Sequence, residues 1–294
     1  MAHSNHIIDG INKEINLQFP DRETFLKLTK NFKSLLPDIV IKKHEGVTVV
    51  REDLLLKGGT KSRAGEFLVS SVKKSTLVYV APRVGHAGVA IMELAKLYNK
   101  DVVFFMPACK EISDHQAAII SMGPKQVEFE RIAAMPNLNR LAKKYAEQND
   151  YEFLPFGLNH PYTIAGFVRV CENILLNYKE PNEMWSVVST GVLTRGLQIG
   201  FENTKMKGVA VARNMKFGEL GRTEIISEPL AFLKNEKIEN LPPFDTVPSY
   251  DGKAWKYIPK NSEKDIWFWN VAGDIKKPNN FDKKTINSYR NWNN

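Results

Sequence analysis

The stretch that decides the fold is Thr76–Met106, which reads TLVYVAPRVGHAGVAIMELAKLYNKDVVFFM. It opens with an apolar run of strand length, and residues 87–98 then carry apolar side chains at helical spacing. A second apolar run, Val102–Met106, follows. A strand, a helix and a strand in this order predict two parallel strands joined by a crossover helix.

The same alternation continues outward on both sides. The sequence predicts further strands at 39–41, 47–51, 126–129, 151–154, 185–189 and 208–212, and helices at 21–37, 64–72, 113–121, 138–147, 164–178 and 194–201. This order favours an α/β fold of three layers, with a mostly parallel, twisted sheet between two layers of helices. The chain is long enough for one large domain or for two unequal lobes. Beyond about residue 213 the pattern breaks up among Gly, Pro and aromatic residues, which we interpret as the end of a lobe plus covering segments.

Composition sets the broad class of the protein. The chain has 294 residues, a net charge of +8, and no apolar run long enough to span a membrane. The polar N-terminus does not resemble a signal peptide, so we expect a cytoplasmic protein. Cys109 and Cys171 show no metal-ligand or redox spacing, so we predict inert thiols and no metal site. The basic charge is scattered, which fits a solvated surface as well as contact with nucleic acid.

Ligands of such sheets bind beyond the carboxyl ends of the strands, so three turns are informative. The first is Gly58-Gly59-Thr60-Lys61-Ser62-Arg63. A lysine at the start of a helix lies near the positive end of the helix dipole and near Arg63, so its protonated ammonium form should be disfavoured. Its neutral amine could then form a Schiff base. A glycine turn followed by solvated charges would give the same local sequence.

The second turn is Arg83-Val84-Gly85-His86-Ala87-Gly88, between a strand and a helix. Backbone N–H groups at such a helix start can bind a carboxylate or phosphate. The glycine spacing is wrong for a dinucleotide site. His86 could carry a proton or serve only as a turn residue.

The third turn is Ser189-Thr190-Gly191-Val192-Leu193-Thr194-Arg195-Gly196, again from strand to helix. Its hydroxyls, amides and arginine suit a dianionic phosphate, although a capped helix with a surface arginine is the plainer alternative. A Walker loop is excluded because no Gly-Lys-Ser/Thr follows.

Taken in order, the three turns resemble the fold-type-II enzymes that use pyridoxal 5′-phosphate (PLP), the group of tryptophan synthase β, cysteine synthase and aminocyclopropane-carboxylate deaminase. The first turn resembles the family's lysine motif, with Lys61 at the position that binds PLP. The second resembles the turn that grips the substrate carboxylate, and the third stands where the phosphate loop belongs. Phe156–Pro161 resembles the stretch before the family's later crossover helix.

The resemblance implies roles for individual residues. It implies catalytic roles for Lys61 and His86, and substrate binding by the second turn. These substrate-binding positions are Arg83, Gly85, Ala87 and Gly88, and the implied cofactor-binding positions are Lys61, Gly85, His86, Ser189, Thr190, Gly191, Thr194 and Arg195.

It also implies a tryptophan synthase β-like division of the chain. Residues 1–50 and about 155–275 would form a larger PLP-binding lobe, about 75–154 a smaller inserted lobe, and 276–294 an exposed tail. A homodimer is implied by the resemblance alone.

The chain departs from the family's pattern at several positions. His86 stands where the family has an asparagine, Arg83 and Val84 replace small hydroxyl residues, and Val192 and Leu193 replace Gly and Thr. For the partner of the pyridine nitrogen the sequence offers only Ser249 or Asn270.

The implied function is a PLP enzyme of the lyase, deaminase or decarboxylase type that forms a Schiff base at Lys61 and acts at Cα or Cβ of an amino acid. The C-terminal stretch Ser249–Trp255 resembles phage relatives linked to thymidine hypermodification, so the amino acid could instead be attached to DNA. A PLP-fold protein without activity, and a phosphate-sugar or nucleotide transferase without PLP, are the two rival classes.

Overall fold

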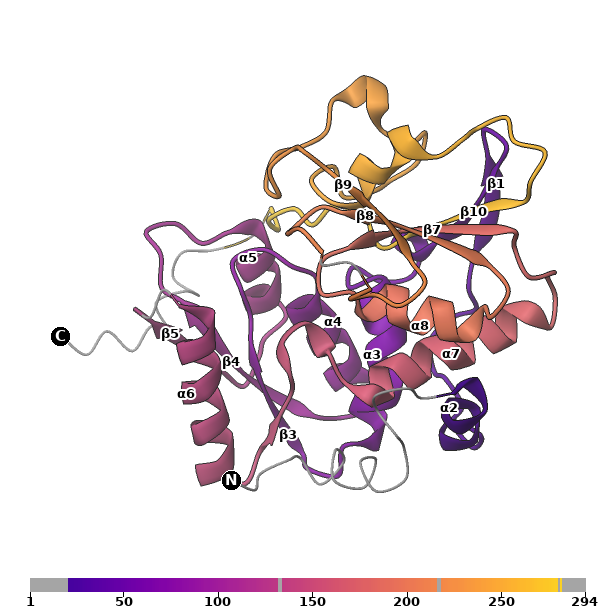
Figure 1. Cartoon of the computed structure of the whole chain (residues 1–294). Helices are drawn as coiled ribbons and strands as arrows, with labels where there is room; N and C mark the ends of the chain where they lie inside the picture. The colour runs from indigo at the N-terminus through magenta and orange to yellow at the C-terminus, as the bar shows by residue number, and fades with distance from the viewer. Residues whose placement is uncertain (1–20, 132–133, 216–217, 280, 282–294) are drawn as a thin grey trace.

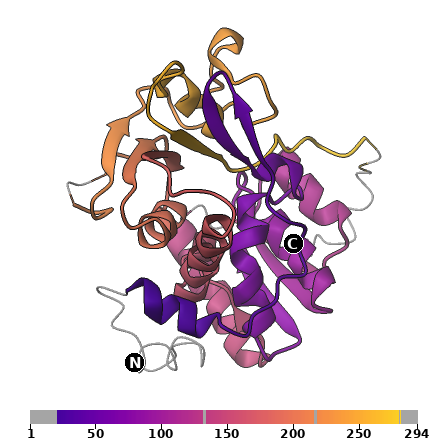
Figure 2. The same cartoon turned by 90° about the vertical axis from the view of Figure 1, so that its right-hand side faces the viewer.

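Two parallel-stranded lobes lie side by side, with helix α3 (Thr60–Ser71) running between them (Figures 1 and 2). The computed structural model describes residues 21–131, 134–215, 218–279 and 281. The N-terminal 20 residues and most of the predicted tail therefore lie outside the described residues. Of that tail, Phe281 packs against the core of the smaller lobe.

The smaller lobe is built on a four-stranded parallel sheet in the order β5-β4-β3-β6. Its strands are β3 (Thr76–Val80), β4 (Asp101–Pro107), β5 (Gln126–Glu130) and β6 (Glu152–Phe153), and its helices are α4 (Ala87–Leu97), α5 (Asp114–Ser121) and α6 (Met135–Gln148). One face packs against α4 and α5, and the other packs against the apolar side of α6. This is the α/β/α sandwich that the alternating periods predict.

The larger lobe has a six-stranded sheet in the order β1-β2-β10-β7-β8-β9, with only β1 antiparallel to its neighbour. Its strands are β1 (Ile41–His44), β2 (Val47–Arg51), β7 (Glu183–Val188), β8 (Lys205–Ala210), β9 (Glu224–Ser227) and β10 (Ile266–Asn270). The helices on one face are α3 (Thr60–Ser71), α7 (Pro161–Leu175) and α8 (Val192–Gly200). Short helix α2 (Arg22–Leu28) packs on α7, and the opposite sheet face is covered by residues 232–258, including a 3-10 helix at Asp251–Tyr257.

Two expectations about secondary structure were wrong. The stretch beyond 213 contains β10, a fully buried strand at the centre of the larger sheet, and not covering segments alone. Trp267 and Trp269 point from it into the core, where the indole of Trp269 donates to Thr60 Oγ1 over 2.9 Å. The helix predicted over 21–37 is also much shorter, because α2 ends at Leu28. The other predicted strands and helices lie within a few residues of their predicted positions.

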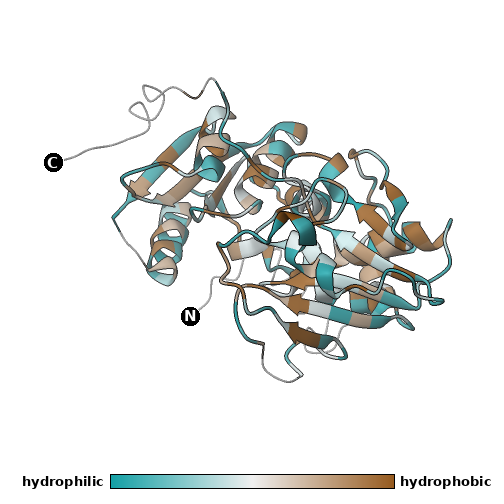
Figure 3. Cartoon of the chain, turned by 90° about the horizontal axis from the view of Figure 1, so that it is seen from above, coloured by the Kyte–Doolittle hydropathy of each residue, from teal (hydrophilic) through white to brown (hydrophobic). Residues whose placement is uncertain are grey.

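Hydrophobic stretches of the chain run along the strands and helices of both lobes, as the view from above in Figure 3 shows. Within the described ranges, each helix is too short or too polar to cross a lipid bilayer. Histidine, cysteine and carboxylate side chains of these residues do not gather in groups of three or more that could hold a metal ion.

Candidate active site

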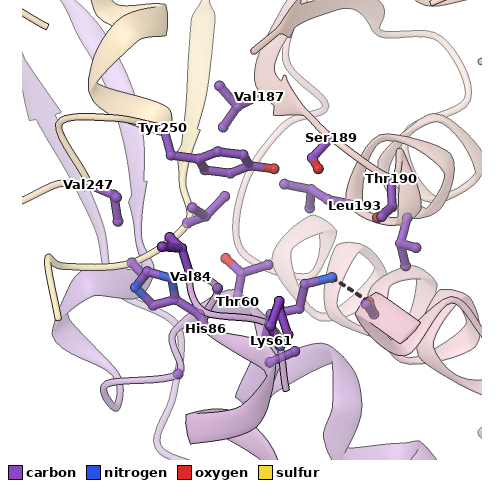
Figure 4. A pocket seen from close by; sticks show the side chains of 18 of the residues that line it. Thr60, Lys61, Val84, His86, Val187, Ser189, Thr190, Leu193, Val247 and Tyr250 are labelled. Carbon is purple, nitrogen blue, oxygen red and sulfur yellow. Dashed lines mark hydrogen bonds between the residues drawn. The ribbon is translucent and has the colours of Figure 1, made fainter. Parts of the chain in front are cut away.

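A cavity of about 290 Å³ lies where the carboxyl ends of β3, β7 and β10 meet the start of α3. All three turns singled out in the sequence contribute to its wall. Figure 4 shows Lys61 between His86 on one side and Ser189 and Thr190 on the other. The lining side chains are otherwise mostly apolar and come from both lobes.

Lys61 is the first-turn residue that reaches into the cavity, and its Nζ donates to the carbonyl oxygen of Gly157 over 2.7 Å (Figure 4). Burial lowers the pKa of this amine from its usual 10.5 to about 8. Arg63, which we expected to contribute, is turned away and paired with Glu52 and the carbonyl oxygen of Pro37. The neutral amine is therefore favoured by loss of water and not by a neighbouring charge.

The turn before Lys61 is held from two sides. The carboxylate of Glu93 on α4 accepts from the amide of Gly58 over 3.0 Å and from the hydroxyl of Ser62 over 2.6 Å. The amide of Thr60 donates to Val271, just after β10, over 2.7 Å. A Cβ at Gly58 would lie 2.6 Å from the backbone of Ala90, so glycine is required for this close approach. The base of the lysine is therefore fixed by both lobes.

The second turn places His86, Gly85 and Ala87 on the cavity wall, but not Arg83 or Gly88. His86 Nε2 lies 3.0 Å from the carbonyl oxygen of Gly273, so this nitrogen is the donor and carries the proton. Burial, with a smaller contribution from His115, lowers the pKa of His86 to about 4, so the ring is neutral. Arg83 is exposed and donates to the Glu111 carbonyl oxygen, while Gly88 packs against Ile119.

The third turn begins α8, and Gly191 is its N-cap with a φ of 79°. No side chain caps this helix start, so its first amides have no intrahelical partner. Ser189, Thr190 and Gly191 line the cavity (Figure 4). Thr194 and Arg195 do not, because the Thr194 hydroxyl pairs with Ser186 over 3.1 Å and Arg195 donates to the Thr190 carbonyl oxygen over 3.1 Å. The loop itself, and not the arginine, presents the anion-binding groups.

Sequence reasoning assigned no role to several residues that line the cavity, including all of its aromatic residues other than His86. Tyr79 accepts from the Gly157 amide through its hydroxyl, and burial raises the pKa of that phenol to about 12. The Tyr250 hydroxyl points toward Ser189 in Figure 4, and burial raises its pKa too. Only Tyr79 carried a local signal, as a hydroxyl within an otherwise apolar strand; the aromatic members of this group are Tyr79, His115, Phe156, Phe167, Phe232 and Tyr250.

The two proposed partners of the pyridine nitrogen lie in different places. Ser249 lines the cavity. Asn270, at the end of β10, lies outside it and donates to Asp53 over 2.6 Å and to the carbonyl oxygen of Asp245 over 2.8 Å. Of the two, only Ser249 can reach a ligand in the cavity.

Asp251 is fully buried behind this wall and joins two of its segments. One oxygen accepts from the amide of Val247 over 3.0 Å, and the other accepts from the amides of Val271 and Ala272 over 2.8 and 3.4 Å. Val247, Val271 and Ala272 all line the cavity. Asp251 is therefore a positioning residue for this side of the site.

We expect Asp251→Ala to lower the free energy of unfolding by roughly 1–3 kcal/mol. Each buried amide left without an acceptor costs about 1–3 kcal/mol, and removal of a carboxyl group whose pKa burial raises to about 7 returns part of that cost. Urea denaturation followed by tryptophan fluorescence measures this change. Asp101→Ala, which removes only an exposed ion pair with Lys125, should cost less than about 1 kcal/mol. Equal losses in the two variants would contradict the role assigned to Asp251.

Comparisons with known proteins address the fold. No protein-family model matches the chain, and no curated protein matches its sequence. Among solved structures, an ACC deaminase homologue is 17% identical with a TM-score of 0.68, covering 86% of this chain and 95% of that one. Maize serine racemase is 13% identical with a TM-score of 0.67, covering 91% and 96%. A pyridoxal 5′-phosphate-dependent aspartate racemase is 14% identical with a TM-score of 0.62, covering 90% and 97%. The chain therefore has the fold of the fold-type-II enzymes, which confirms the predicted architecture.

Proposed function

We propose that this chain, which has the fold-type-II fold, binds PLP at Lys61 and acts on the amino group of an amino acid. The observation that carries the proposal is the position of Lys61 Nζ. Among the side chains that line the cavity it alone bears a formal charge, and burial shifts its pKa toward neutrality. It also stands opposite an uncapped helix start with two hydroxyl groups beside it. A cofactor that carries an aldehyde and a phosphate requires an amine nucleophile for the first group and an anion-binding helix start for the second.

The residues present fit this cofactor. The amides at the start of α8, with the hydroxyls of Ser189 and Thr190, would hold the phosphate, and the helix dipole favours its charge. Arg195 would act from behind by fixing the Thr190 carbonyl group. Ser249 would face the ring nitrogen. When bound, PLP supplies an electron sink for a bond broken at Cα of the substrate.

The chain's own residues would bind the substrate and move its protons. The amides of the Gly85–Ala87 turn, at the start of α4, would hold the carboxylate. Lys61 Nζ, once released, would accept and return a proton at Cα, because burial keeps its pKa near working pH. His86 is neutral with its N–H committed to Gly273, so its Nδ1 can only accept a hydrogen bond.

The proposed reaction is of the lyase, deaminase or decarboxylase type on a free amino acid, in a homodimer. The alternative substrate is an amino acid attached to a base of DNA. A screen of free amino acids against amino-acid-modified DNA distinguishes the two. Turnover of modified DNA alone would favour the phage-type activity, and PLP binding without any turnover would favour a protein that has lost catalysis.

The test of cofactor binding uses pH. We expect the rate of PLP attachment to Lys61, trapped with borohydride, to rise about tenfold per pH unit up to about pH 8 and then to level off, because only the neutral amine reacts. The neutral fraction of an ordinary lysine, with a pKa near 10.5, keeps rising up to about pH 10.5. At pH 7 the neutral fraction of Lys61 is therefore roughly 300-fold larger than that of an ordinary lysine. Quantitative mass spectrometry of the Lys61 peptide measures the rate, with Nα-acetyl-lysine as the reference. A profile that parallels the reference would contradict the proposal.

A further inference from the structure

A second cleft lies at the opposite end of the larger sheet from the cavity beside Lys61. It has a volume of about 260 Å³ and is bordered by β1, by the starts of β2 and β10, and by the chain that follows α7. Thr48 and Trp267 stand near the amino ends of their parallel strands, whereas the active-site cavity lies beyond the carboxyl ends. The two hollows share no lining residue, so the cleft is a separate candidate for a binding site.

The register of the sheet directs Lys43 toward this cleft. Lys43 pairs with Thr48 across β1 and β2, and Thr48 pairs with Trp267 across β2 and β10. Residues paired in this way point to the same face of a sheet, which here is the face on which α7 packs. Beyond the end of α7, the ring of Tyr178 stands edge-on to the indole of Trp267, with ring centroids 5.5 Å apart. Lys179 follows, so a lysine of the sheet and a lysine of the α7 side both border the cleft.

The charge of the cleft favours an anion. Lys42, Lys43 and Lys179 border it, and within the described residues none of the three forms an ion pair. Asp265 is the one carboxylate among the described lining residues, and the end of α7 adds about half a negative charge. The balance therefore stays positive. Because lysine ammonium groups bind phosphate as point charges, we expect the anion to carry a phosphate group.

Two further side chains restrict the molecule that carries this phosphate. Tyr178 is 44% exposed, and an exposed aromatic ring offers a nucleic-acid base a surface on which to stack. Asp265 is held in place, since its amide donates to Asn182 over 3.0 Å and its Oδ2 accepts from the Trp267 indole over 2.9 Å. Among the described residues its Oδ1 has no donor, and a carboxylate in such a position accepts from the hydroxyls of a ribose. A phosphate, a base and a sugar together indicate a nucleotide.

We infer that this cleft binds a nucleoside monophosphate, with the phosphate at Lys43 and Lys179, the base on Tyr178 and the ribose at Asp265. Inorganic phosphate would use the lysines alone and leave the ring and the carboxylate without a role. The inference is independent of the proposed function, because the cleft contains none of the residues of the active-site cavity.

The test is isothermal titration calorimetry of the full chain with AMP, adenosine and inorganic phosphate. We expect AMP to bind about tenfold more tightly than either of the other two, because it alone combines the phosphate with a base that can stack. Its affinity should fall severalfold between about 50 and 200 mM salt. Excess PLP should leave the AMP affinity unchanged, because PLP is expected at Lys61. Displacement of AMP by PLP, or equal affinity for AMP and phosphate, would overturn the inference.

Substitutions locate the bound nucleotide. Lys43→Ala and Lys179→Ala should each weaken AMP about fivefold, and Tyr178→Ala should also weaken it about fivefold, while Tyr178→Phe retains the stacking surface and the affinity. Lys30→Ala is the matched control, because Lys30 is an exposed lysine outside the cleft and its loss removes the same charge. An equal loss in the Lys30 variant, or full affinity in the Tyr178→Ala variant, would show that AMP does not bind here. Neither outcome alters the prediction of PLP attachment at Lys61.

Discussion

Replacing Lys61 with alanine should reduce borohydride-trapped PLP on the protein about tenfold. PLP would be attached through a covalent bond to the Lys61 amine, and among the described residues no other amine lines the cavity to replace it. The same change removes a partly buried ammonium group, whose pKa of about 8 reports a cost of desolvation in the folded state. A lowered lysine pKa means that stability is depressed below about pH 8 and recovers as pH rises toward 10.5. Lys61→Ala should therefore also raise the free energy of unfolding at pH 7, by about 1–3 kcal/mol.

The control for this prediction is Lys57→Ala. Lys57 lies four residues earlier on the same loop, is exposed, and does not line the cavity, so its loss should leave attachment and stability unchanged. Absorbance before reduction and intact-mass measurement after it give the occupancy, and urea denaturation gives the stability. A visible cofactor band that persists in the Lys61 variant, or an equal loss in the Lys57 variant, would show that the lysine has been assigned wrongly.

The sequence predicted the architecture well where side-chain periodicity is a local property. Strands such as β3 and helices such as α4 follow one another with clear changes of period, so their positions were correct to a few residues. Strand β10 was missed because five buried residues rich in tryptophan look like any short apolar segment. Its partner β2 lies more than 200 residues earlier, and a parallel pairing at that separation leaves no mark in the nearby sequence.

In the site, the backbone turns could be predicted from the sequence, but the directions of the side chains could not. The turns were found because glycines at the ends of strands are visible in the sequence, and the structure brings all three to one cavity. The directions of Thr194 and Arg195 could not be predicted, since each is set by a partner, Ser186 or the Thr190 carbonyl group. His115 was missed for a related reason: only the packing of α5 against His86 brings it to the cavity.

Gly191→Ala should weaken PLP binding by at least tenfold and lower the free energy of unfolding by more than about 1–2 kcal/mol. With a φ of 79°, the residue adopts a backbone conformation that costs alanine about 1 kcal/mol or more. The added Cβ would also lie 2.5 Å from Leu220, so the loop or that side chain must move. The amides of Val192 and Leu193 follow directly and would lose their alignment at the start of α8. Fluorescence titration with PLP and urea denaturation measure the two effects.

Gly123→Ala separates the energetic cost of a positive φ for alanine from the loss of the phosphate-binding amides at the start of α8. Gly123 has a similar φ of 72°, but a Cβ there would meet nothing within 4 Å, and the residue lies outside the cavity. It should therefore show the cost of positive φ and retain wild-type affinity for PLP. If the two variants bind PLP equally well, the start of α8 does not hold the phosphate, because the same backbone penalty was imposed on both. If only Gly191→Ala loses affinity, the binding depends on the alignment of those amides, and Arg195 is left with the supporting role that its bond to Thr190 gives it.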